Sequence, residues 1–381
     1  MTARRRQRRF DVCFYCPWIG PLLSPGSDLP PGGAETQIFL LAQALCEAGM
    51  RVGIVSFDVA AGLPKRVGGV DVIVQRRPRT ALPVLRALDY AASMIGTLGR
   101  LDADVVVQRA AGTTTGLVGC ITRLRRRRFV YSSANVIDFS YDELERNRRY
   151  VWLYELGVRL ADQIVVQTDE QAVLCRERFG REALVIKSLA EPTSAARPAP
   201  DAFLWVGRLT HYKHPEAFVA LARALPDARF RLVGVPYGEE GERIATALRA
   251  ASAELQNVEL LEPRSRPELM QLIERAVAMV NTADYEGMPN IFLEAWSRGV
   301  PALALTHDPG GVVERHRLGG FARGDLQTFI GLARELWATR SDREDLSQRC
   351  RSYVAEEHAP AVIAECWKSV LRSAPALRAA A

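Results

Sequence analysis

The sequence predicts an α/β protein built from two doubly wound domains, and three observations support this prediction. Short apolar strands alternate with amphipathic helices along most of the chain, which is the pattern of a parallel sheet with helices on both faces. The alternation stops at a proline-rich stretch and then restarts. The 381 residues are too many for one ordinary core but suffice for two domains. Two facing domains leave a cleft, where the loops at the carboxyl ends of the strands converge.

The first half, residues 1–190, begins with a basic tail and the strand-like run FDVCFYC. A Gly-rich turn and a helix are predicted within residues 30–50, and a second helix at residues 112–124. Strands are predicted at residues 10–16, 51–57, 102–110, 128–134, 161–168 and 183–190. This spacing of strands and helices is typical of one doubly wound domain.

A linker is predicted at residues 191–200, because three prolines with Ala, Ser and Thr make a poor core segment. The second half, residues 201–360, repeats the α/β rhythm. Strands are predicted at residues 202–209, 229–235, 258–262, 277–283 and 301–305, and helices at residues 214–226, 239–255, 267–276 and 290–299. The C-terminal segment, residues 361–381, is expected to hold a helix that can pack back on the first half.

The net charge is +6 and the pI is near 9.0, with much of the excess in the N-terminal arginines Arg4–Arg9 and in Arg125–Arg128. Such patches suit an anionic lipid surface or a nucleic acid, although a solvated tail and a basic loop explain them equally well. No aromatic-interleaved basic motif is present, so we expect no nucleic-acid partner. No apolar run approaches the ~20 residues that span a bilayer, and the N-terminus does not resemble a signal peptide. We expect a cytoplasmic protein, with peripheral attachment to the inner face of the plasma membrane as an option.

The seven cysteines are scattered and odd in number, which argues against a disulfide framework and fits a reducing compartment. Cys13 and Cys16 form one CxxC pair, which allows a redox or metal site. A metal site would need a second pair, and none exists. Because the pair lies inside an apolar strand-like run, we favour two packed core thiols.

Gly32 and Gly33 lie in the turn PPGGAE, between the first predicted strand and its helix. Glycines there allow a close backbone approach or a positive φ, and amides at a helix N-terminus suit an anion. The turn matches neither GxGxxG nor GxxxxGK[ST]. A simple glycine turn therefore remains the default interpretation.

Arg208 and Lys213 follow the first predicted strand of the second half, in VGRLTHYKH. Both could reach a diphosphate, Arg208 as a planar fork and Lys213 as a point charge. Two exposed basic side chains in a loop are the plainer interpretation. Their place at the expected cleft favours the functional one.

The stretch DYEGMPNIFLE places Glu286 and Glu294 eight positions apart, around a turn into a helix. Pro289 or Asn290 can start that helix, so Glu286 lies in the loop and Glu294 on the first turn. The amides between them suit an anion. A carboxylate accepts two hydrogen bonds from a vicinal diol, as ribose or a hexose presents, and the rival use is a glycosidase acid and nucleophile pair. We rank the glycosidase lower, because it would not need the basic pair and the glycine loops.

Three segments resemble family 4 glycosyltransferases of the GT-B fold, and they occur in the order of that family. EGMPNIFLEAWSRGVPALAL resembles its glutamate-x7-glutamate signature. FLWVGRLTHYKHPEAFVALARAL is similar to the opening of its C-terminal nucleotide-sugar donor-binding domain, and GGAETQIFLLAQALCEAGMRVGIVS to the opening of its N-terminal acceptor-side domain. The resemblance covers most of the chain, and the combination of segments is specific.

The resemblance implies a retaining transfer of a hexose from a UDP- or GDP-linked sugar to a glycan or lipid-linked acceptor, in bacterial polysaccharide or glycolipid synthesis. It implies no metal and no other cofactor. Arg208 and Lys213 would hold the diphosphate, Glu294 the ribose and Glu286 the donor sugar. The remaining expected donor contacts are Gly32, Gly33, Gly287, Met288, Pro289 and Asn290. The leaving diphosphate would help to deprotonate the acceptor, so stabilisation of its charge would be the main contribution of the protein.

Two positions depart from the family pattern. Many members carry a histidine after the strand at residues 102–110, where it contacts the donor sugar, and this chain has Gln108 and Arg109 there. Some relatives share a glutamine and an arginine at this place, so the departure changes the expected sugar contact and does not imply inactivity. Ala283 stands where serine is common, which is a minor change.

None of the five histidines falls in a metal or triad pattern. His211 and His214 flank Lys213 and could line the cleft, but we favour solvated loop histidines. His307, His316 and His358 have no partner that the sequence identifies. A non-catalytic nucleotide-sugar binding protein and a sugar-nucleotide epimerase remain alternatives. The sequence does not name the base, the sugar, the acceptor, the linkage or the oligomeric state.

Overall fold

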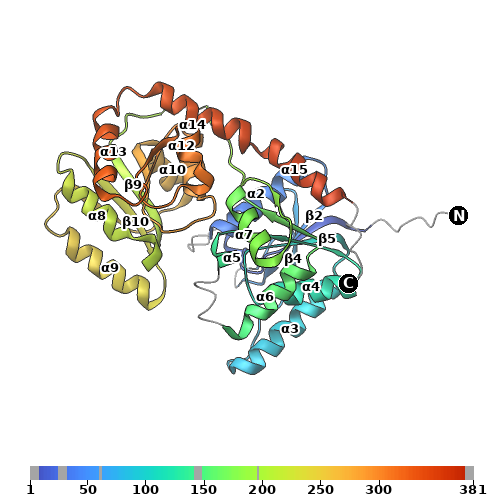
Figure 1. The fold of residues 1–381 in the computed structure, drawn as a ribbon. Coiled ribbons are helices and arrows are strands. Elements are labelled where there is room, and N and C mark those ends of the chain that lie inside the picture. The colour runs from blue at the N-terminus through green and yellow to red at the C-terminus, as the bar shows by residue number, and fades with distance from the viewer. Residues whose placement is uncertain (1–7, 25–31, 60–61, 141–147, 195–196, 374–381) are drawn as a thin grey trace. The chain divides into compact units, whose positions relative to one another are not determined.

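The computed structural model describes residues 8–24, 32–59, 62–140, 148–194 and 197–373, which form two compact units (Figure 1). Unit 1 comprises residues 1–189 and 360–381, and unit 2 comprises residues 190–359. Each unit is an α/β layer structure with a mainly parallel sheet, so the predicted fold class is confirmed. The last helix of the chain belongs to unit 1.

The sheet of unit 1 has the strand order β3-β4-β2-β1-β5-β6-β7-β8 and is parallel except for the β3–β4 pair. Its strands are β1 (Phe10–Tyr15), β2 (Val52–Phe57), β3 (Arg66–Val67), β4 (Val70–Gln75), β5 (Ala103–Arg109), β6 (Arg128–Ser132), β7 (Gln163–Val166) and β8 (Leu184–Val185). Alternate side chains of β1 enter opposite cores, Val12 and Phe14 on one face and Cys13 and Tyr15 on the other. Burial on both faces explains why β1 reads as a continuous apolar run.

Helices cover both faces of this sheet. They are α1 (Gly20–Leu23), α2 (Gly33–Glu47), α3 (Pro83–Arg100), α4 (Thr114–Leu124), α5 (Ile137–Ser140), α6 (Arg148–Leu160), α7 (Asp169–Phe179) and α15 (Pro360–Arg372). Residues of α2 and α15 share one core, and residues of α3, α4, α6 and α7 share the other. α15 packs beside α2 (Figure 1), where Trp367 and Leu371 are buried.

Unit 2 has the fully parallel strand order β11-β10-β9-β12-β13-β14. The strands are β9 (Ala202–Leu209), β10 (Phe230–Pro236), β11 (Val258–Leu261), β12 (Ala276–Asn281), β13 (Ala302–Ala304) and β14 (Gly319–Phe321). The α-helices are α8 (Pro215–Ala224), α9 (Gly238–Ser252), α10 (Arg266–Glu274), α11 (Asn290–Ser297), α12 (Val312–Arg315), α13 (Leu326–Ala338) and α14 (Glu344–Glu357). Two 3-10 turns, η2 (His211–Lys213) and η3 (Pro309–Gly311), follow β9 and β13. Helices α8, α9 and α13 pack on one face, and α10, α11 and α14 on the other.

Each sheet reverses its strand order once. In unit 1 the chain order turns around between β1 and β5, and in unit 2 between β9 and β12. In open α/β sheets the loops at the carboxyl ends of the strands diverge at such a point and leave a crevice that binds ligands. The register pairs Trp205 with Val280, so the chain leaves β9 and β12 at the same edge of the sheet.

Several parts of unit 1 differ from the sequence prediction. The strand predicted at residues 183–190 is only the two-residue edge strand β8. Beyond it Leu189 is buried, but its backbone N–H and C=O bond to the side chain of Gln37 at 2.8 and 2.9 Å instead of joining the sheet. The β3–β4 hairpin and the helices α3, α6 and α7 were not predicted. Helix α3 leaves several apolar side chains exposed.

Candidate functional site

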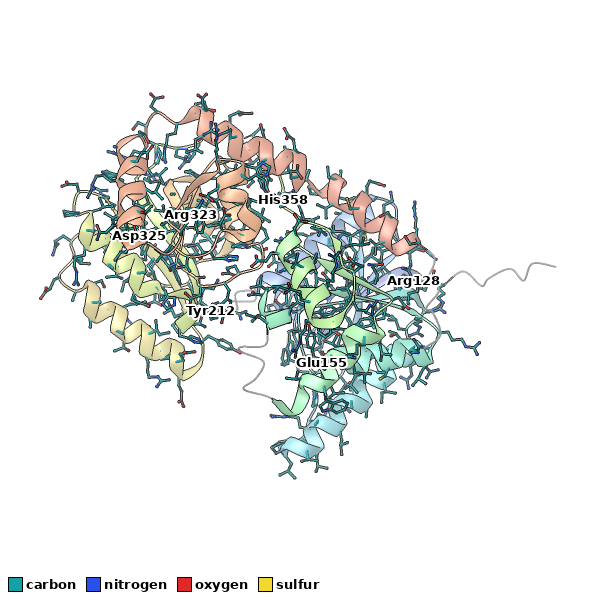
Figure 2. The ribbon with its side chains drawn as sticks, viewed as in Figure 1. Arg128, Glu155, Tyr212, Arg323, Asp325 and His358 are labelled. Atoms are coloured by element: carbon teal, nitrogen blue, oxygen red, sulfur yellow. The ribbon has the colours of Figure 1, made fainter. Side chains whose placement is uncertain are left out.

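Two loops at the switch point of unit 2 are fastened to each other by several contacts. One contains η2 after β9, and the other connects β12 to α11. The N–H of Asp284 donates to the carbonyl of Tyr212 at 2.9 Å, and the hydroxyl of Thr282 donates to the carbonyl of Lys213 at 2.6 Å. The rings of Tyr212 and Tyr285 stack with centroids 4.8 Å apart; Tyr212 is labelled in Figure 2. These contacts fix the position of Lys213 relative to the loop that carries Glu286.

His214 reinforces the same junction. Its φ of 45° is in the left-handed region, and it is the N-cap residue of α8. Its Nε2 lies 2.8 Å from Asp284 and its Nδ1 lies 2.7 Å from Glu216. Partial burial lowers its pKa, but the hydrogen bonds to both carboxylates outweigh this and leave the pKa raised. His211 similarly lies 3.1 Å from Glu240, so both histidines are anchored by carboxylates rather than only solvated.

Lys213 and Glu286 form an ion pair at this junction. Their side chains are only 20% and 13% exposed. Burial, with the nearby Arg208 guanidinium, lowers the pKa of Lys213 to about 8. The carboxylate of Glu286 is therefore the counter-charge that this desolvated ammonium has in the absence of ligand.

Arg208 is the second cation of this group. It sits at the end of β9, is exposed, and places its guanidinium 5.4 Å from the ring centroid of Tyr237. Among the described residues it has no carboxylate partner within ion-pair distance. Its charge and its hydrogen-bond donors are thus accessible to an anion.

The N-terminus of α11 lies directly after the loop that carries Glu286. No side chain caps this end, and its first turn contains no acidic residue, so its positive dipole is not compensated there. Gly287, Met288 and Pro289 are all buried, and the side chain of Met288 belongs to the core. Only the backbone of Met288 is therefore suited to contact a ligand. Asn290 is the first residue of the helix.

His307 was missed by the sequence reasoning. Burial, with a contribution from the Lys213 charge, lowers its pKa to about 4, and its ring has a hydrogen bond with the backbone of Gly287. The imidazole is neutral at physiological pH and supports the loop before α11. Its position just after the strand predicted at residues 301–305, at the same carboxyl edge, was the signal that could have identified it.

The contacts of Glu294 are separate from those of the Lys213–Glu286 pair. It is the fifth residue of α11, which places it on the second turn and not on the first turn as predicted. Its carboxylate pairs with Nη1 of Arg266 at 2.8 Å. Arg266 begins α10 behind a capping box formed by Ser265 and Glu268. This arginine was not singled out from the sequence, because nothing there indicates that α10 and α11 start side by side.

The switch point of unit 1 brings other predicted residues together. Gly32 caps α2 with a φ of −70° and Gly33 is helical, so the positive φ considered for Gly32 is not adopted. Gln108, at the end of β5, donates to Thr114 at 2.9 Å. Burial lowers the pKa of Arg109 to about 10, and its Nε is buried without a hydrogen-bond partner in the described residues. Arg109 is thus a desolvated cation at the carboxyl edge of this sheet.

The two basic patches divide into structural and exposed arginines. Arg4–Arg6 lie outside the described residues. Arg8 and Arg9 pair with Asp104 and Asp71 at 3.5 and 3.2 Å. Arg127 donates to the carbonyls of Leu98 and Gly99, and Arg128 donates to those of Leu371 and Val370 at 2.8 and 3.0 Å. Arg128, labelled in Figure 2, thereby caps the end of α15. Only Arg125 and Arg126 of this run are fully exposed.

Cys13 and Cys16 are buried thiols in and just after β1, without a disulfide, and burial raises the pKa of both. This places both thiols in the core. Within the described ranges, no group of three or more His, Cys, Asp or Glu side chains is arranged to hold a metal ion.

Comparisons with known proteins assign most of the chain to glycosyltransferase families. Residues 32–187 match the model of the glycosyl transferase 4-like domain, and residues 190–351 match that of glycosyl transferases group 1. An uncharacterised glycosyltransferase of Haemophilus influenzae is 25% identical over 367 residues, which cover 89% of this chain and 96% of that protein.

Two solved structures share the fold across nearly the whole chain. Sucrose-phosphate synthase from Thermosynechococcus elongatus has a TM-score of 0.76 at 18% identity, covering 95% of this chain and 98% of its own. HepE from Anabaena, solved in complex with UDP and glucose, has a TM-score of 0.74 at 17% identity, covering 96% and 100%.

Proposed function

Because the chain belongs to the group 1 glycosyltransferases and has their GT-B fold, we propose that it transfers a hexose, with retention, from a UDP- or GDP-linked donor. The acceptor we propose is a glycan or a lipid-linked glycan of bacterial polysaccharide or glycolipid synthesis. The observation that carries the proposal is the Lys213–Glu286 pair between Arg208 and the uncapped start of α11, at the switch point of unit 2. Cations and a helix N-terminus suit a diphosphate, and a carboxylate suits sugar hydroxyls.

In the proposed donor complex, the diphosphate replaces Glu286 as the counter-charge of Lys213. Arg208 adds a planar fork and α11 adds its first amides, so the negative charge meets donors from three directions. Glu286, released from Lys213, accepts hydroxyls of the donor sugar. Lys213 thus exchanges one charged partner for another, and Glu286 exchanges Lys213 for hydroxyl donors, so neither group is left without a partner.

Glu294 is the proposed ligand of the nucleotide ribose. Its side chain is largely buried and its position is set by Arg266, which is more exposed. A carboxylate held in this way offers its second oxygen to a vicinal diol. Through its ion pair with Glu294, Arg266 is a further proposed contact of the nucleotide, which the sequence had not indicated.

The chemistry that these residues supply is stabilisation of the leaving nucleotide diphosphate. As the bond from the sugar to the diphosphate breaks, negative charge grows on the leaving oxygen. In the proposed donor complex Lys213, Arg208 and the α11 amides stabilise this charge, with little further reorganisation during the reaction. We propose that the leaving diphosphate accepts the acceptor proton, that these cations take the place of a metal, and that no separate general base is required.

Arg109 is proposed as a substrate contact of unit 1, at the place where many relatives carry a histidine. Its buried Nε lacks a partner among the described residues, and burial disfavours its charge. A hydroxyl-rich or anionic substrate group would accept a hydrogen bond from this Nε and would stabilise the charge of the guanidinium. Gly33, at the start of α2, lies at the same switch point.

Peripheral attachment to an anionic membrane is the location we propose, and α3 is the surface that supports it. At 100° per residue, Val84, Leu88 and Ile95 fall within about 40° on this helix. They are 74%, 62% and 51% exposed, and the exposed Arg125 and Arg126 lie near the C-terminal end of α3. An apolar row next to cations suits the surface of an anionic bilayer. Of the described helices, none is long and apolar enough to cross one.

Flotation with phosphatidylglycerol vesicles tests this location. We expect binding at low salt that weakens in high salt and falls several-fold in Leu88→Glu. Val362→Glu, an equivalent change at another exposed helical position, is the control and should float like the wild type. Absence of binding at low salt, or equal flotation of both variants, would contradict the proposal.

A thermal-shift panel of nucleotide sugars tests the donor site, since a ligand that binds only the folded state raises stability by about 2.7 kcal/mol at 100 times its Kd. We expect one UDP- or GDP-sugar to raise the unfolding midpoint in the wild type and in Lys65→Gln, an exposed control, but much less in Lys213→Gln. Mass spectrometry then tests transfer to extracted acceptors. No shift with any donor would sink the proposal, and binding without turnover would indicate a non-catalytic binding protein.

A further inference from the structure

A pocket of about 850 Å³ lies in unit 2, between the segment that leads in from unit 1 and the start of α14. Its volume is within the range of small-molecule sites. Arg197 extends into it from the linker, and Arg340, Arg343 and Arg351 line it from the end of α13 and from α14. No predicted donor-site residue lines this pocket.

The pocket is at the opposite edge of the sheet from the donor loops. Arg197 donates from Nε to the carbonyl of Glu274 at 3.0 Å, and Arg343 donates from Nη2 to the carbonyl of Val277 at 3.0 Å. These carbonyls flank the start of β12, whereas Glu286 follows its end. Six residues of strand separate the two edges, which is about 20 Å at the usual rise per residue.

Positive charge exceeds negative charge around this pocket. Its four arginines face two acidic residues, Asp342 and Glu344. Within the described part of the chain, only Arg351 of the four has a carboxylate at ion-pair distance, Glu344, and that side chain is mostly exposed. The pocket therefore keeps an uncompensated positive charge at neutral pH.

Arg343 has side-chain donors that the described residues leave unused. Its Nε and Nη1 are buried without a hydrogen-bond partner among the described residues. Burial lowers the pKa of Arg343 and of Arg197 to about 10, yet both remain charged at pH 7. A buried cation with unused donors is costly unless an anion satisfies it.

We propose that this arginine pocket binds a soluble phosphate-bearing molecule, a phosphomonoester or a diphosphate. Phosphate oxygens match the planar forks of guanidinium groups, and the volume leaves room for an organic group beside the phosphate. Such a ligand would contact Arg343 and Arg340. Arg197, which donates to the carbonyls of Glu274, Ala276 and Gly299, would contribute its charge to the same pocket. The linker enters unit 2 at Ala190, whose N–H donates to the carbonyl of His358 at 3.0 Å, next to the point where the chain leaves the unit. His358 is labelled in Figure 2.

Isothermal titration of the full chain with pyrophosphate tests the proposal. Arg343→Gln should weaken binding about tenfold or more, the order expected for one charge-assisted hydrogen bond. Arg340→Gln is the second variant, because the Nη2 contact of Arg343 can matter for folding, while the Arg340 guanidinium stacks on Trp337 at 4.1 Å. The matched control is Arg349→Gln, which removes the same charge from α14 outside the pocket.

Lys213→Gln separates the pocket from the donor loops. The proposal expects one pyrophosphate site that survives Lys213→Gln and is weakened by both pocket variants. It is overturned if pyrophosphate does not bind, if the pocket variants bind like Arg349→Gln, or if Lys213→Gln abolishes all binding. Vesicles of phosphatidylglycerol provide the lipid arm. Binding to vesicles that Arg340→Gln removes, without competition by pyrophosphate, would assign the pocket to a headgroup and refute a soluble ligand.

Discussion

Replacing Glu286 with glutamine tests the exchange of partners at the donor site. The change keeps the size of the side chain and removes the counter-charge of Lys213. Breaking a fully buried ion pair from one side costs about 3–5 kcal/mol. Because the two side chains are 20% and 13% exposed and so not fully buried, we expect a smaller loss, of about 2–3 kcal/mol. For a unit of this size, that lowers the unfolding midpoint by roughly 5–10 °C.

The same variant should separate binding from turnover. In the free wild type, Glu286 competes with the diphosphate for Lys213, so Glu286→Gln should bind UDP at least as tightly as the wild type. Transfer of the sugar should fall by more than about tenfold, since a neutral amide is a weaker acceptor for hydroxyls than a carboxylate. UDP affinity is measured by titration calorimetry and transfer by mass spectrometry.

Glu259→Gln is the matched control. Glu259 is an exposed residue of β11, and its carboxylate forms an ion pair with Arg231 at 3.1 Å. We expect that variant to lose less than about 1 kcal/mol and to keep its activity. The reasoning would be refuted if Glu286→Gln were as stable as Glu259→Gln, or if it bound UDP much more weakly than the wild type. Near-full transfer activity would show that Glu286 does not hold the donor sugar.

Three further outcomes are expected. UDP affinity should be constant near pH 7 and fall by up to about tenfold per pH unit above about 8, as Lys213 loses its proton, and calorimetry on Lys213→Gln should show no such fall. Arg128→Gln removes two hydrogen bonds from the end of α15 and should raise amide exchange in residues 360–372 while UDP affinity stays unchanged. Gly157→Ala should lower the unfolding midpoint, at a cost of about 2 kcal/mol, because its Cβ would lie 2.4 Å from the backbone of Thr115; Gly96→Ala, a helical glycine with open space, is the control and should be neutral or stabilising.

The sequence was most informative about candidate site residues that lie at the end of a strand or in the loop after it. Arg208 lies at the end of a predicted strand, Lys213 and Glu286 lie in loops that follow predicted strands, and the parallel fold brings those strand ends to one edge. Pattern alone could therefore place these residues in one region. The pairing of Lys213 with Glu286 could not be predicted, because it depends on the contacts of Tyr212 and Thr282 that fix the two loops.

Other features depend on contacts between segments far apart in the chain. The four consecutive arginines at residues 125–128 look equivalent in the sequence. In the structure Arg127 and Arg128 donate hydrogen bonds to carbonyls of α3 and α15, whereas Arg125 and Arg126 remain exposed. The partner of Glu294, Arg266, and the arginine pocket arise in the same way. Long arginine side chains reach carbonyls and carboxylates that no local pattern reveals.

The ion pair in the free protein also bears on donor selectivity in the proposed role. A ligand that brings only a phosphate compensates Lys213 but leaves the carboxylate of Glu286 largely buried without a partner. A free sugar compensates Glu286 but leaves the ammonium of Lys213 desolvated. Each unmatched group costs about 1–3 kcal/mol, and a ligand with one part loses this amount relative to the complete donor. Pairing the two charges in advance therefore favours a molecule that carries a diphosphate and sugar hydroxyls together.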